Sequence, residues 1–576
     1  MTRLSGDQRL IGAGTRRPVV TVAIFAAAVS LFLAAPPATA APPANPSRQE
    51  AINAEVACIT AYAADPANNY VNYAPAIGAP EVTDAIHSGL QPCASFADDS
   101  SGKKNINHTG RKYQVAQYLS PTVYPGQIQM IIQGGPDAAF LIGGAPGTPI
   151  PSYTGGPYVA RFNPTTGAQL WRTALPLAPG QWVAAPSGAV VKGGWVDVVI
   201  GPNIYKLNPK TGAIVASVQQ PVFAGAAIDA NFDGFAVAPD ANGTILLKSQ
   251  NRSAGCTIQG NQAMSMCVAQ FGPQPVTTVV AIDPVTLKNI SAIALNQAVI
   301  SRPTVVSNKG NTEMYLSGNT QGVRVIWNPK TKTLSQDLTW APSYLLPGQN
   351  PGDAPVPVGD WVVFNNNAFP TQGVPICAVA VRMTNAADIH RLCPWGTTLP
   401  AGVTSNAPAS FSTDPQKSLI FMQDLLVGGV FAVHLDQASG EMVAKWSRPD
   451  WRTSDYFTAV GPASHRVLSS QYMNPNFNVG QVSNNSWTEG VLWVDEATGK
   501  TLAQSAYNGP TQLGWMVMPS YAGRFYSMTT NGTINIYVPQ ACATKGKPRV
   551  PAPSITTCST DYAALPQPIA YPAPRP

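Results

Sequence analysis

The sequence predicts an all-β protein: a seven- or eight-bladed β-propeller of four-stranded blades, with a small N-terminal helical cap held by a disulfide. Three observations support this prediction: an internal repeat, a composition poor in charge, and cysteines that fall into neighbouring pairs. Only 11% of the residues are charged, against about 25% in ordinary soluble domains. Asn, Gln, Ser, Thr, Gly and Pro supply the polarity instead, which suits short strands and tight turns better than long surface helices.

The repeat consists of an apolar strand, an Asn or Asp, and a short turn with Thr or Ser and usually Gly. Six segments carry it: Tyr158–Gly167, Ile204–Gly212, Val279–Thr286, Val323–Thr331, Val430–Gly440 and Val491–Gly499. A seventh, weaker copy lies at Cys377–Thr384, and Ile534–Tyr537 is an eighth strand of the same kind without its turn. In each copy the Asn or Asp caps the turn through its side chain, and Gly accepts the positive φ that closes the hairpin.

The spacing of the copies indicates the architecture. Asn163 and Asn208 are 45 residues apart, as are Asp283 and Asn328, and this is the length of one propeller blade with its connections. The step from Asn208 to Asp283 is 75 residues, so this blade carries an insertion or an additional blade lies there. A series of unrelated β-sandwich domains would need linkers, and none is visible in the sequence.

These segments resemble the repeat of the quinoprotein alcohol dehydrogenase-like superfamily, in which a strand is followed by Asp-x-x-Thr-Gly-x-x-x-Trp. The likeness covers roughly residues 115–540, and only the first copy keeps Thr166, Gly167 and Trp171 at the family's spacing. The superfamily includes pyrroloquinoline-quinone (PQQ) dehydrogenases and non-enzymatic outer-membrane assembly lipoproteins. The resemblance therefore implies the propeller fold and leaves the activity open.

The chain divides into four parts. Residues 1–40 have the form of a secretory signal peptide, with four arginines, an apolar run from Val19 to Ala35 and a small-residue cleavage site that ends at Ala40. An uncleaved membrane anchor is the alternative, although the apolar run is short for a bilayer span. Residues 41–111 form an N-terminal capping segment, 112–540 the PQQ-like propeller, and 541–576 a Pro-rich tail with one disulfide. We therefore expect a secreted or cell-envelope-associated protein with no transmembrane span in the mature chain.

The eight cysteines form four pairs of neighbours in a chain with an export signal. Eight cysteines allow many connectivities, and the economy of short loops favours the disulfides Cys58–Cys93, Cys256–Cys267, Cys377–Cys393 and Cys542–Cys558. Each bridge would stabilise the fold by about 3 kcal/mol in the chain-entropy model. No Cys-x-x-Cys or zinc spacing occurs, so the cysteines are interpreted as structural.

The charge of the chain argues against nucleic acid as a partner. The chain has 35 basic and 29 acidic residues, a net charge of +6, and removal of residues 1–40 leaves 31 basic and 28 acidic residues. This balance cannot neutralise a phosphate backbone, and the sequence has no Lys/Arg cluster with interleaved aromatics. We therefore expect an extracellular ligand, polymer or protein as the partner.

The sharpest local motif is a candidate calcium loop. Asp229, Asn231, Asp233 and Asp240 occupy positions one, three, five and twelve, with Gly at position six. Oxygen ligands at these positions are what calcium uses in a tight loop. The alternative is a hairpin with its turn at Asp240, which would place this residue at the far end of a strand from Asp233. The stretch also resembles a hairpin of gluconolactonase-like propellers, in which Asp233 takes the position of a metal-binding Asn near the channel.

Four aromatic residues are candidates for ligand binding. Trp451, Tyr456, Tyr472 and Trp487 lie in long connections, several of them rich in Asn and Ser. Propellers bind ligands where such loops surround the central channel. Packing within the loops is the alternative interpretation.

No catalytic constellation can be assembled from the sequence. The best-known PQQ dehydrogenases have adjacent cysteines, a catalytic Asp, and a Glu and an Asn on calcium, but this chain has no Cys-Cys pair and no family cofactor residue can be placed in it. We therefore expect an exported propeller that binds a ligand, glycan or protein outside the cytoplasm, with calcium as a candidate cofactor and PQQ disfavoured. The alternative is an extracellular enzyme with its site in the channel, either a quinoprotein-like oxidoreductase or a metal-dependent hydrolase or lactonase.

Overall fold

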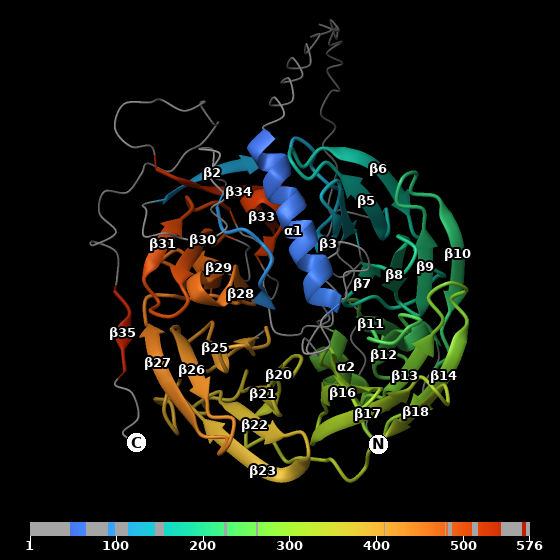
Figure 1. The fold of residues 1–576 in the computed structure, drawn as a ribbon. Helices are drawn as coiled ribbons and strands as arrows, with labels where there is room; N and C mark the ends of the chain where they lie inside the picture. Colours follow the sequence, from blue (N-terminus) through green and yellow to red (C-terminus); the bar gives the residue numbers. More distant parts are fainter. Residues whose placement is uncertain are drawn as a thin grey trace, which may run out of the picture. The chain divides into compact units, whose positions relative to one another are not determined.

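Eight sheets of mainly antiparallel strands stand around a central axis, and each sheet is one blade of a β-propeller (Figure 1). A computed structural model of the chain describes residues 46–64, 90–97, 113–144, 155–223, 227–260, 263–407, 409–478, 480–481, 486–509, 517–542 and 567–571. The predicted fold class is confirmed, and the number of blades is eight. The expected signal peptide, residues 1–40, lies outside the described residues.

Blades 1 to 4 each have four strands, which are named below from the innermost to the outermost. Blade 1 consists of β3 (Ile128–Gly135), β4 (Ala138–Gly143), β5 (Tyr158–Phe162) and β6 (Gln169–Ala174). Blade 2 consists of β7 (Ser187–Val190), β8 (Val196–Ile200), β9 (Asn203–Leu207) and β10 (Ile214–Gln219). Blade 3 consists of β11 (Ala230–Val237), β12 (Ile245–Asn251), β13 (Thr278–Ile282) and β14 (Asn289–Ala294). Blade 4 consists of β15 (Thr304–Asn308), β16 (Asn311–Ser317), β17 (Gly322–Asn328) and β18 (Thr333–Gln336).

Blades 5 to 7 carry additional short strands. In blade 5, β19 (Asn350–Pro351) and β20 (Val356–Val358) both pair with β21 (Trp361–Asn367), followed by β22 (Ala378–Arg382) and β23 (Asn385–Leu392). Blade 6 consists of β24 (Ser412–Asp414), β25 (Leu419–Gln423), β26 (Val430–Leu435) and β27 (Met442–Arg448), with β35 (Ile569–Ala570) outside β27. Blade 7 consists of β28 (Thr458–Val460), β29 (Val467–Met473), β30 (Glu489–Asp495) and β31 (Thr501–Gln504), with β1 (Leu90–Gln91) parallel to β28.

Blade 8 closes the ring with strands from both ends of the propeller. Its first three strands are β32 (Met518–Pro519), β33 (Phe525–Met528) and β34 (Ile534–Ala541). The outermost strand, β2 (Tyr113–Leu119), comes from the other end of the propeller and pairs antiparallel with β34 along its whole length. This closure explains why the repeat copy at Ile534–Tyr537 has no turn: its outer partner does not follow it in the chain.

The repeat motif forms the turn between the third and fourth strands of a blade. In blade 1, Asn163 Oδ1 accepts hydrogen bonds from the N–H groups of Thr165 (2.8 Å) and Thr166 (3.1 Å), and Gly167 takes φ +71°. The same turn is built on Asn208, Asp283, Asn328, Asp436 and Asp495. The predicted turn chemistry is confirmed, except that Leu287 and Lys332 take the positive φ in blades 3 and 4.

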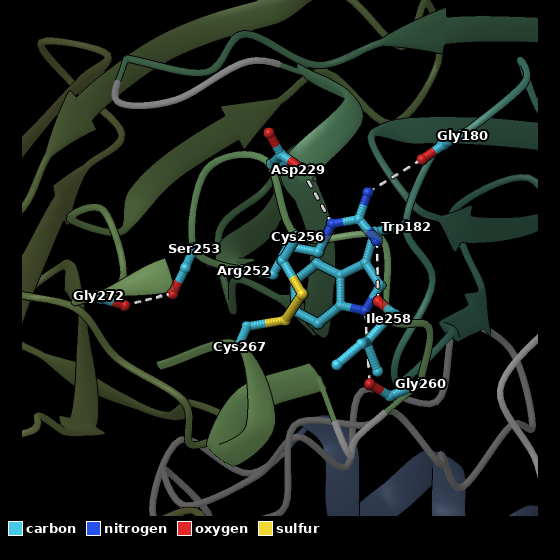
Figure 2. Close-up of a disulfide and its surroundings, with 10 residues drawn as sticks. All are labelled: Gly180, Trp182, Asp229, Arg252, Ser253, Cys256, Ile258, Gly260, Cys267 and Gly272. Atoms are coloured by element: carbon cyan, nitrogen blue, oxygen red, sulfur yellow. Dashed lines mark hydrogen bonds and ion pairs between the residues drawn. A yellow bond between two sulfur atoms is a disulfide. The ribbon is translucent and has the colours of Figure 1, made fainter. Parts of the chain in front are cut away.

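The 75-residue step between Asn208 and Asp283 is an insertion within blade 3. It lies between β12 and β13 and contains α2 (Ala263–Phe271) and the disulfide Cys256–Cys267. The disulfide packs against the buried indole of Trp182, which lies at the start of blade 2 (Figure 2). This contact holds the insertion against the neighbouring blade.

Two more of the predicted disulfides, Cys58–Cys93 and Cys377–Cys393, are present. Cys542 is also disulfide-bonded, and its predicted partner Cys558 lies outside the described residues. The short loops that these bridges close restrict the unfolded chain, which is the main source of their stabilising effect.

The N-terminal helix α1 (Pro46–Ala64) packs on blade 8 (Figure 1). Glu55 of this helix accepts hydrogen bonds from the N–H groups of Ser95 (3.0 Å) and Ala522 (2.9 Å). Ala522 belongs to the 3-10 turn η3 (Tyr521–Gly523), which joins β32 to β33. None of the helices in the described ranges has both the length and the apolar character needed to cross a bilayer.

Because the strands of a blade alternate in direction, the ring has two chemically distinct faces. The turn face holds the turns between first and second and between third and fourth strands; in blades 2 to 4 these are residues 191–195, 208–213, 238–244, 283–288, 309–310 and 329–332. The connection face holds the loops between second and third strands and the passages between blades, including residues 175–186, 252–277, 295–303, 393–411 and 449–457.

Candidate functional site

A cavity of about 190 Å³ lies at the end of the channel that opens on the connection face. Its lining comes from the inner strands and preceding segments of five successive blades, from Ala185 before β7 to Ala407 before β24. Segments from so many blades meet only near the axis of the ring. The polar side chains of the lining are Asp233, Gln250, Ser301, Arg302, Asp353 and Asn367.

Arg302, Asp353 and Tyr456 form a network across this end of the channel. They precede β15 of blade 4, β20 of blade 5 and β28 of blade 7 respectively. Arg302 donates its N–H to Asp353 Oδ1 (3.0 Å) and Nη1 to Asp353 Oδ2 (2.5 Å). The Tyr456 hydroxyl donates to Asp353 Oδ2 and accepts from Arg302 Nη1 (3.1 Å). Three blades are therefore joined by one set of charge-assisted hydrogen bonds.

The network keeps Asp353 in its ionised form. Burial on its own would raise the pKa of this carboxyl, but the charge of Arg302 and the hydrogen bonds from Arg302 and Tyr456 hold the pKa below its ordinary value. Side-chain exposure is only 12% for Arg302 and 11% for Asp353, so the pair is largely protected from water. At neutral pH, Asp353 is thus an acceptor and a fixed negative charge, and not a proton donor.

A second ion pair borders the cavity on blade 3. Asp233 of β11 and Lys248 of β12 are partners in the strand register, and Lys248 Nζ lies 2.7 Å from Asp233 Oδ1. Lys248 also donates to the carbonyl of Ile300 (3.3 Å). Both side chains are buried, which is tolerated only because each charge meets its opposite. With Arg302 and Asp353, the cavity has two positive and two negative groups and no net charge.

Gln250 is the lining residue whose polar atoms are free to meet a ligand. It follows Lys248 by two residues on β12, so both side chains point to the same side of the sheet. Its exposure is 6%, and within the described ranges no protein group forms a hydrogen bond with its amide. By contrast, Gln423 on β25 of blade 6 donates to the carbonyls of Ala409 and Ser410 (3.3 Å each). The Gln250 amide faces the cavity without a protein partner among the described residues, so a ligand there can form hydrogen bonds with it.

The expected calcium loop is corrected by the structure. The 3-10 turn η1 (Ala227–Asp229) ends at Asp229, Asn231 and Asp233 lie within β11, and Asp240 lies in the turn after it. Residues along a strand are about 3.3 Å apart, so Asp229 and Asp240 are at opposite ends of the blade. The hairpin alternative is the correct one, and the four side chains do not converge on one point.

Asp229 fastens the blade 3 insertion instead. Its Oδ1 accepts from Arg252 Nε (2.9 Å), and the same guanidinium donates to the carbonyls of Ile258 (2.8 Å) and Gly180 (3.1 Å). Figure 2 shows Arg252 between these groups and beside the disulfide. Asp229 therefore neutralises a cation that ties the insertion to blade 2, and it is not placed to hold a metal.

Asn231 and Asp240 are also engaged within the protein. Asn231 Oδ1 accepts from the N–H of Ala184 (3.2 Å). Asp240 Oδ1 accepts from Thr244 N (3.1 Å), and Oδ2 accepts from Trp327 Nε1 (2.9 Å). No group of three or more His, Cys, Asp or Glu that could hold a metal ion occurs in the described part of the chain. The candidate ligands are thus turn caps and ion-pair partners.

Of the four expected aromatic ligand residues, only Tyr456 reaches the network at the cavity. The other three are buried, Trp451 and Trp487 in connections and Tyr472 on β29, so they do not offer a ring face to solvent. Trp451, Tyr472 and Trp487 donate hydrogen bonds to Gln471 O (2.8 Å), Asp450 Oδ2 (3.3 Å) and Glu489 Oε1 (2.9 Å), respectively. Loop packing, the alternative interpretation, accounts for Trp451 and Trp487, and Tyr472 packs on its strand against Tyr507.

Sequence reasoning missed Gln250, Arg302 and Asp353. None of them belongs to a motif, and they come together only because the ring brings blades 3, 4 and 5 to one axis. One usable signal was present: each lies within a few residues of the start of a first strand or the end of a second strand, where a propeller meets its channel.

No known family model and no curated protein sequence matches the chain. Similar solved structures include BamB from Moraxella catarrhalis, with a TM-score of 0.37, 12% identity, and coverage of 74% of this chain and 99% of that chain. They also include the quinohemoprotein alcohol dehydrogenase ADHIIG from Pseudomonas putida (TM-score 0.41, 12% identity, 86% of this chain and 84% of that chain). The quinohemoprotein alcohol dehydrogenase from Comamonas testosteroni gives a TM-score of 0.40 at 12% identity, over 88% of this chain and 85% of that chain. The chain is an eight-bladed β-propeller.

Proposed function

We propose that the chain is an exported binding propeller whose ligand site is the cavity at the connection-face end of the channel. The proposed ligand is a small, neutral, hydroxyl-rich group such as the end of a glycan chain. The observation that carries this proposal is Gln250, an amide that lines the cavity at 6% exposure and has no hydrogen-bond partner within the described ranges.

The size and charge of the cavity support this class of ligand. Its volume of about 190 Å³ is smaller than the roughly 300–1,000 Å³ of sites that enclose a drug-sized molecule, so it suits one small unit or a chain end. Its charges cancel, because Asp233 is paired with Lys248 and Asp353 with Arg302. Hydroxyl groups can both donate to and accept from such ion pairs. A charged ligand would be attracted by one member of each pair and repelled by the other.

The state of the charged groups supports binding over catalysis. Asp353 is held below its ordinary pKa by Arg302, so it is poorly suited to donate a proton at neutral pH. Its oxygens are occupied by Arg302 and Tyr456, and Asp233 is occupied by Lys248. Groups fixed in this way preorganise a binding site and lose little conformational entropy when a ligand enters.

The disulfides support an extracellular or envelope location. Three are formed in the described residues, and such bridges persist in oxidising compartments and are rare in the cytosol. Together with the signal-like segment of residues 1–40, they favour action outside the cytoplasm.

The test compares two glutamines in equivalent second strands. Saccharides of increasing length are titrated into the exported protein by calorimetry, and then into Gln250→Leu and Gln423→Leu. We expect Gln250→Leu to weaken saccharide binding about tenfold, the effect of one good hydrogen bond, without loss of stability. Gln423→Leu should instead destabilise the fold by about 1 kcal/mol, because the carbonyl of Ser410 loses its donor, while that of Ala409 keeps the hydrogen bond from Asn365 Nδ2.

Two results would contradict the proposal. The first is an unmodified protein that binds no saccharide, and the second is a Gln250→Leu variant with unchanged affinity. Dye-linked oxidation of alcohols or sugars after reconstitution with calcium and PQQ is run in parallel, and clear turnover would favour the enzymatic alternative.

A further inference from the structure

Most of the exposed lysines in the described residues lie on one of the two faces of the propeller. In blades 2 to 4 the turn face carries six exposed lysines: Lys192, Lys210, Lys288, Lys309, Lys330 and Lys332. The connections of the opposite face contain no lysine in any described segment. The sequence shows no cluster because these lysines come from turns that are tens of residues apart, and only the ring brings them together.

Little negative charge opposes this group, which we call the lysine face. The carboxylates on the same turns, Asp240 and Asp283, are half-buried and occupied by their own turns. Asp240 also accepts from the indole of Trp327. The turns of blades 2 to 4 therefore present a clear excess of positive charge to solvent.

The lysine face is continuous across the three blades. Lys192 of blade 2 donates Nζ to the carbonyl of Ala241 in the blade 3 turn (2.8 Å). A hollow of about 270 Å³ follows between the turns of blades 3 and 4, and it is lined by Asp240, Ala241, Asn311 and Lys330 among others. Lys309 lies next to the hollow, between lining residues of the same turn. The lysines thus border a hollow that can accommodate small head groups.

The chemistry of the lysine face fits a surface with many diffuse charges. Lysine is a point charge on a flexible stem, and arginine is the residue that binds single phosphates with a defined geometry. No arginine belongs to the exposed set, and Val285, which is 64% exposed, projects from the blade 3 turn beside the lysines. Positive side chains around an exposed apolar one are suited to the interface of an anionic bilayer.

The helix α1 lies on the same side of the ring as the lysine face. The helix packs through Glu55 against Ala522 in the first turn of blade 8, and that turn belongs to the turn face. The N-terminal end of the folded chain and the lysine face therefore share one side of the ring.

We propose that the lysine face docks the propeller on an anionic lipid surface and leaves the connection face, with its cavity, turned away from the membrane. Each lysine near such a surface contributes about 1 kcal/mol, which corresponds to about a fivefold change in binding. Screening by salt should weaken the interaction, since these side chains are exposed.

The test measures co-sedimentation of the exported protein with vesicles of phosphatidylcholine alone and of phosphatidylcholine mixed with phosphatidylglycerol. The variant Lys309→Gln/Lys330→Gln removes two charges from the lysine face. The matched control Arg172→Gln/Lys445→Gln removes two exposed charges from the outer strands β6 and β27. We expect binding only to the mixed vesicles, a loss of about 30-fold in the first variant, and no more than a twofold change in the control.

Thermal unfolding of both variants verifies that the fold is retained. Binding that is equal for the two vesicle types, or equal losses in the two variants, would overturn the proposal. Retention on a soluble polyanion such as heparin without vesicle binding would also overturn it, because the face would then serve an anionic polymer.

Discussion

A rise in pH from about 5 to about 8 should weaken the fold through the buried carboxyl of Glu496. This residue lies in the last turn of blade 7, where Lys417 Nζ is 2.7 Å from its Oε2 and its Oε1 has no hydrogen-bond partner within the described ranges. A neighbouring pair, Asp414 and Arg466, is fully buried at 2.6 Å. Burial first, and then the charge of Asp414, raises the pKa of Glu496 to about 8 in spite of Lys417.

The sign of the effect follows from the raised pKa. Below an ordinary pKa of 4.5, Glu496 is protonated in both the folded and the unfolded chain, and its contribution to stability is fully present. Between that value and about 8 only the folded chain keeps the proton, so the free energy of unfolding falls as the pH rises. The slope for one such group is at most about 1.4 kcal/mol per pH unit. Asp197, whose pKa burial raises to about 7, acts in the same direction.

The measurement is urea unfolding of the exported protein at several pH values, followed by tryptophan fluorescence. In Glu496→Gln the fall in stability between about pH 5 and pH 8 should be smaller by several kcal/mol, because the amide does not titrate. Glu441→Gln, an exposed change in the corresponding turn of blade 6, should keep the full pH dependence. A Glu496→Gln profile parallel to that of the unmodified protein would refute the reasoning.

Two further predictions concern the closure of the ring and the insertion. Val115→Ala on the closing strand β2 removes two buried methyl groups and should lower the free energy of unfolding by about 2 kcal/mol, whereas Val123→Ala at an exposed position should change it by less than about 0.5 kcal/mol. Equal effects in urea unfolding would argue against a closure that depends on β2. Removal of the disulfide in Cys256→Ala/Cys267→Ala should lower the free energy of local unfolding of the insertion by about 3 kcal/mol. We expect this as faster hydrogen exchange in residues 252–277. Faster exchange in the ladder between β2 and β34 as well would contradict a local role.

The blade architecture was predictable because its signal is local. Each copy of the repeat contains its own strand, its own capping Asn or Asp and its own turn, and these bonds form between residues two to four apart. The short disulfides were predictable for the same reason. The repeat predicts seven or eight blades and does not distinguish between them, because β34 has its outer partner at the other end of the propeller and the insertion in blade 3 lengthens one interval.

The cavity was not predictable because the residues that form it are far apart in the sequence. Arg302, Asp353 and Tyr456 come from three blades, and their bonds span up to 154 positions. The spacing of Asp229, Asn231, Asp233 and Asp240 is compatible with both a calcium loop and a hairpin. The pairing of Asp233 with Lys248 across two strands favours the hairpin, and this pairing is not visible in the local sequence. Net charge is also a weak guide to anionic partners, because a chain with little net charge can still concentrate its lysines on one face.

The separation of charge between the two faces follows from the repeat itself. In the turns that begin at Asn208 and Asn328, Pro follows the capping Asn and the next residue is an exposed lysine, Lys210 or Lys330. Such positions accept any side chain without cost to the fold, so charge can accumulate there while the turn bonds stay intact. The connections on the opposite face are longer and pack against each other, as the buried rings of Trp451 and Trp487 show. The charged groups Arg302 and Asp353 are paired there beside the cavity, whereas the lysines of the turn face extend into solvent, so one face of the ring is suited to diffuse attraction and the other to a defined cavity.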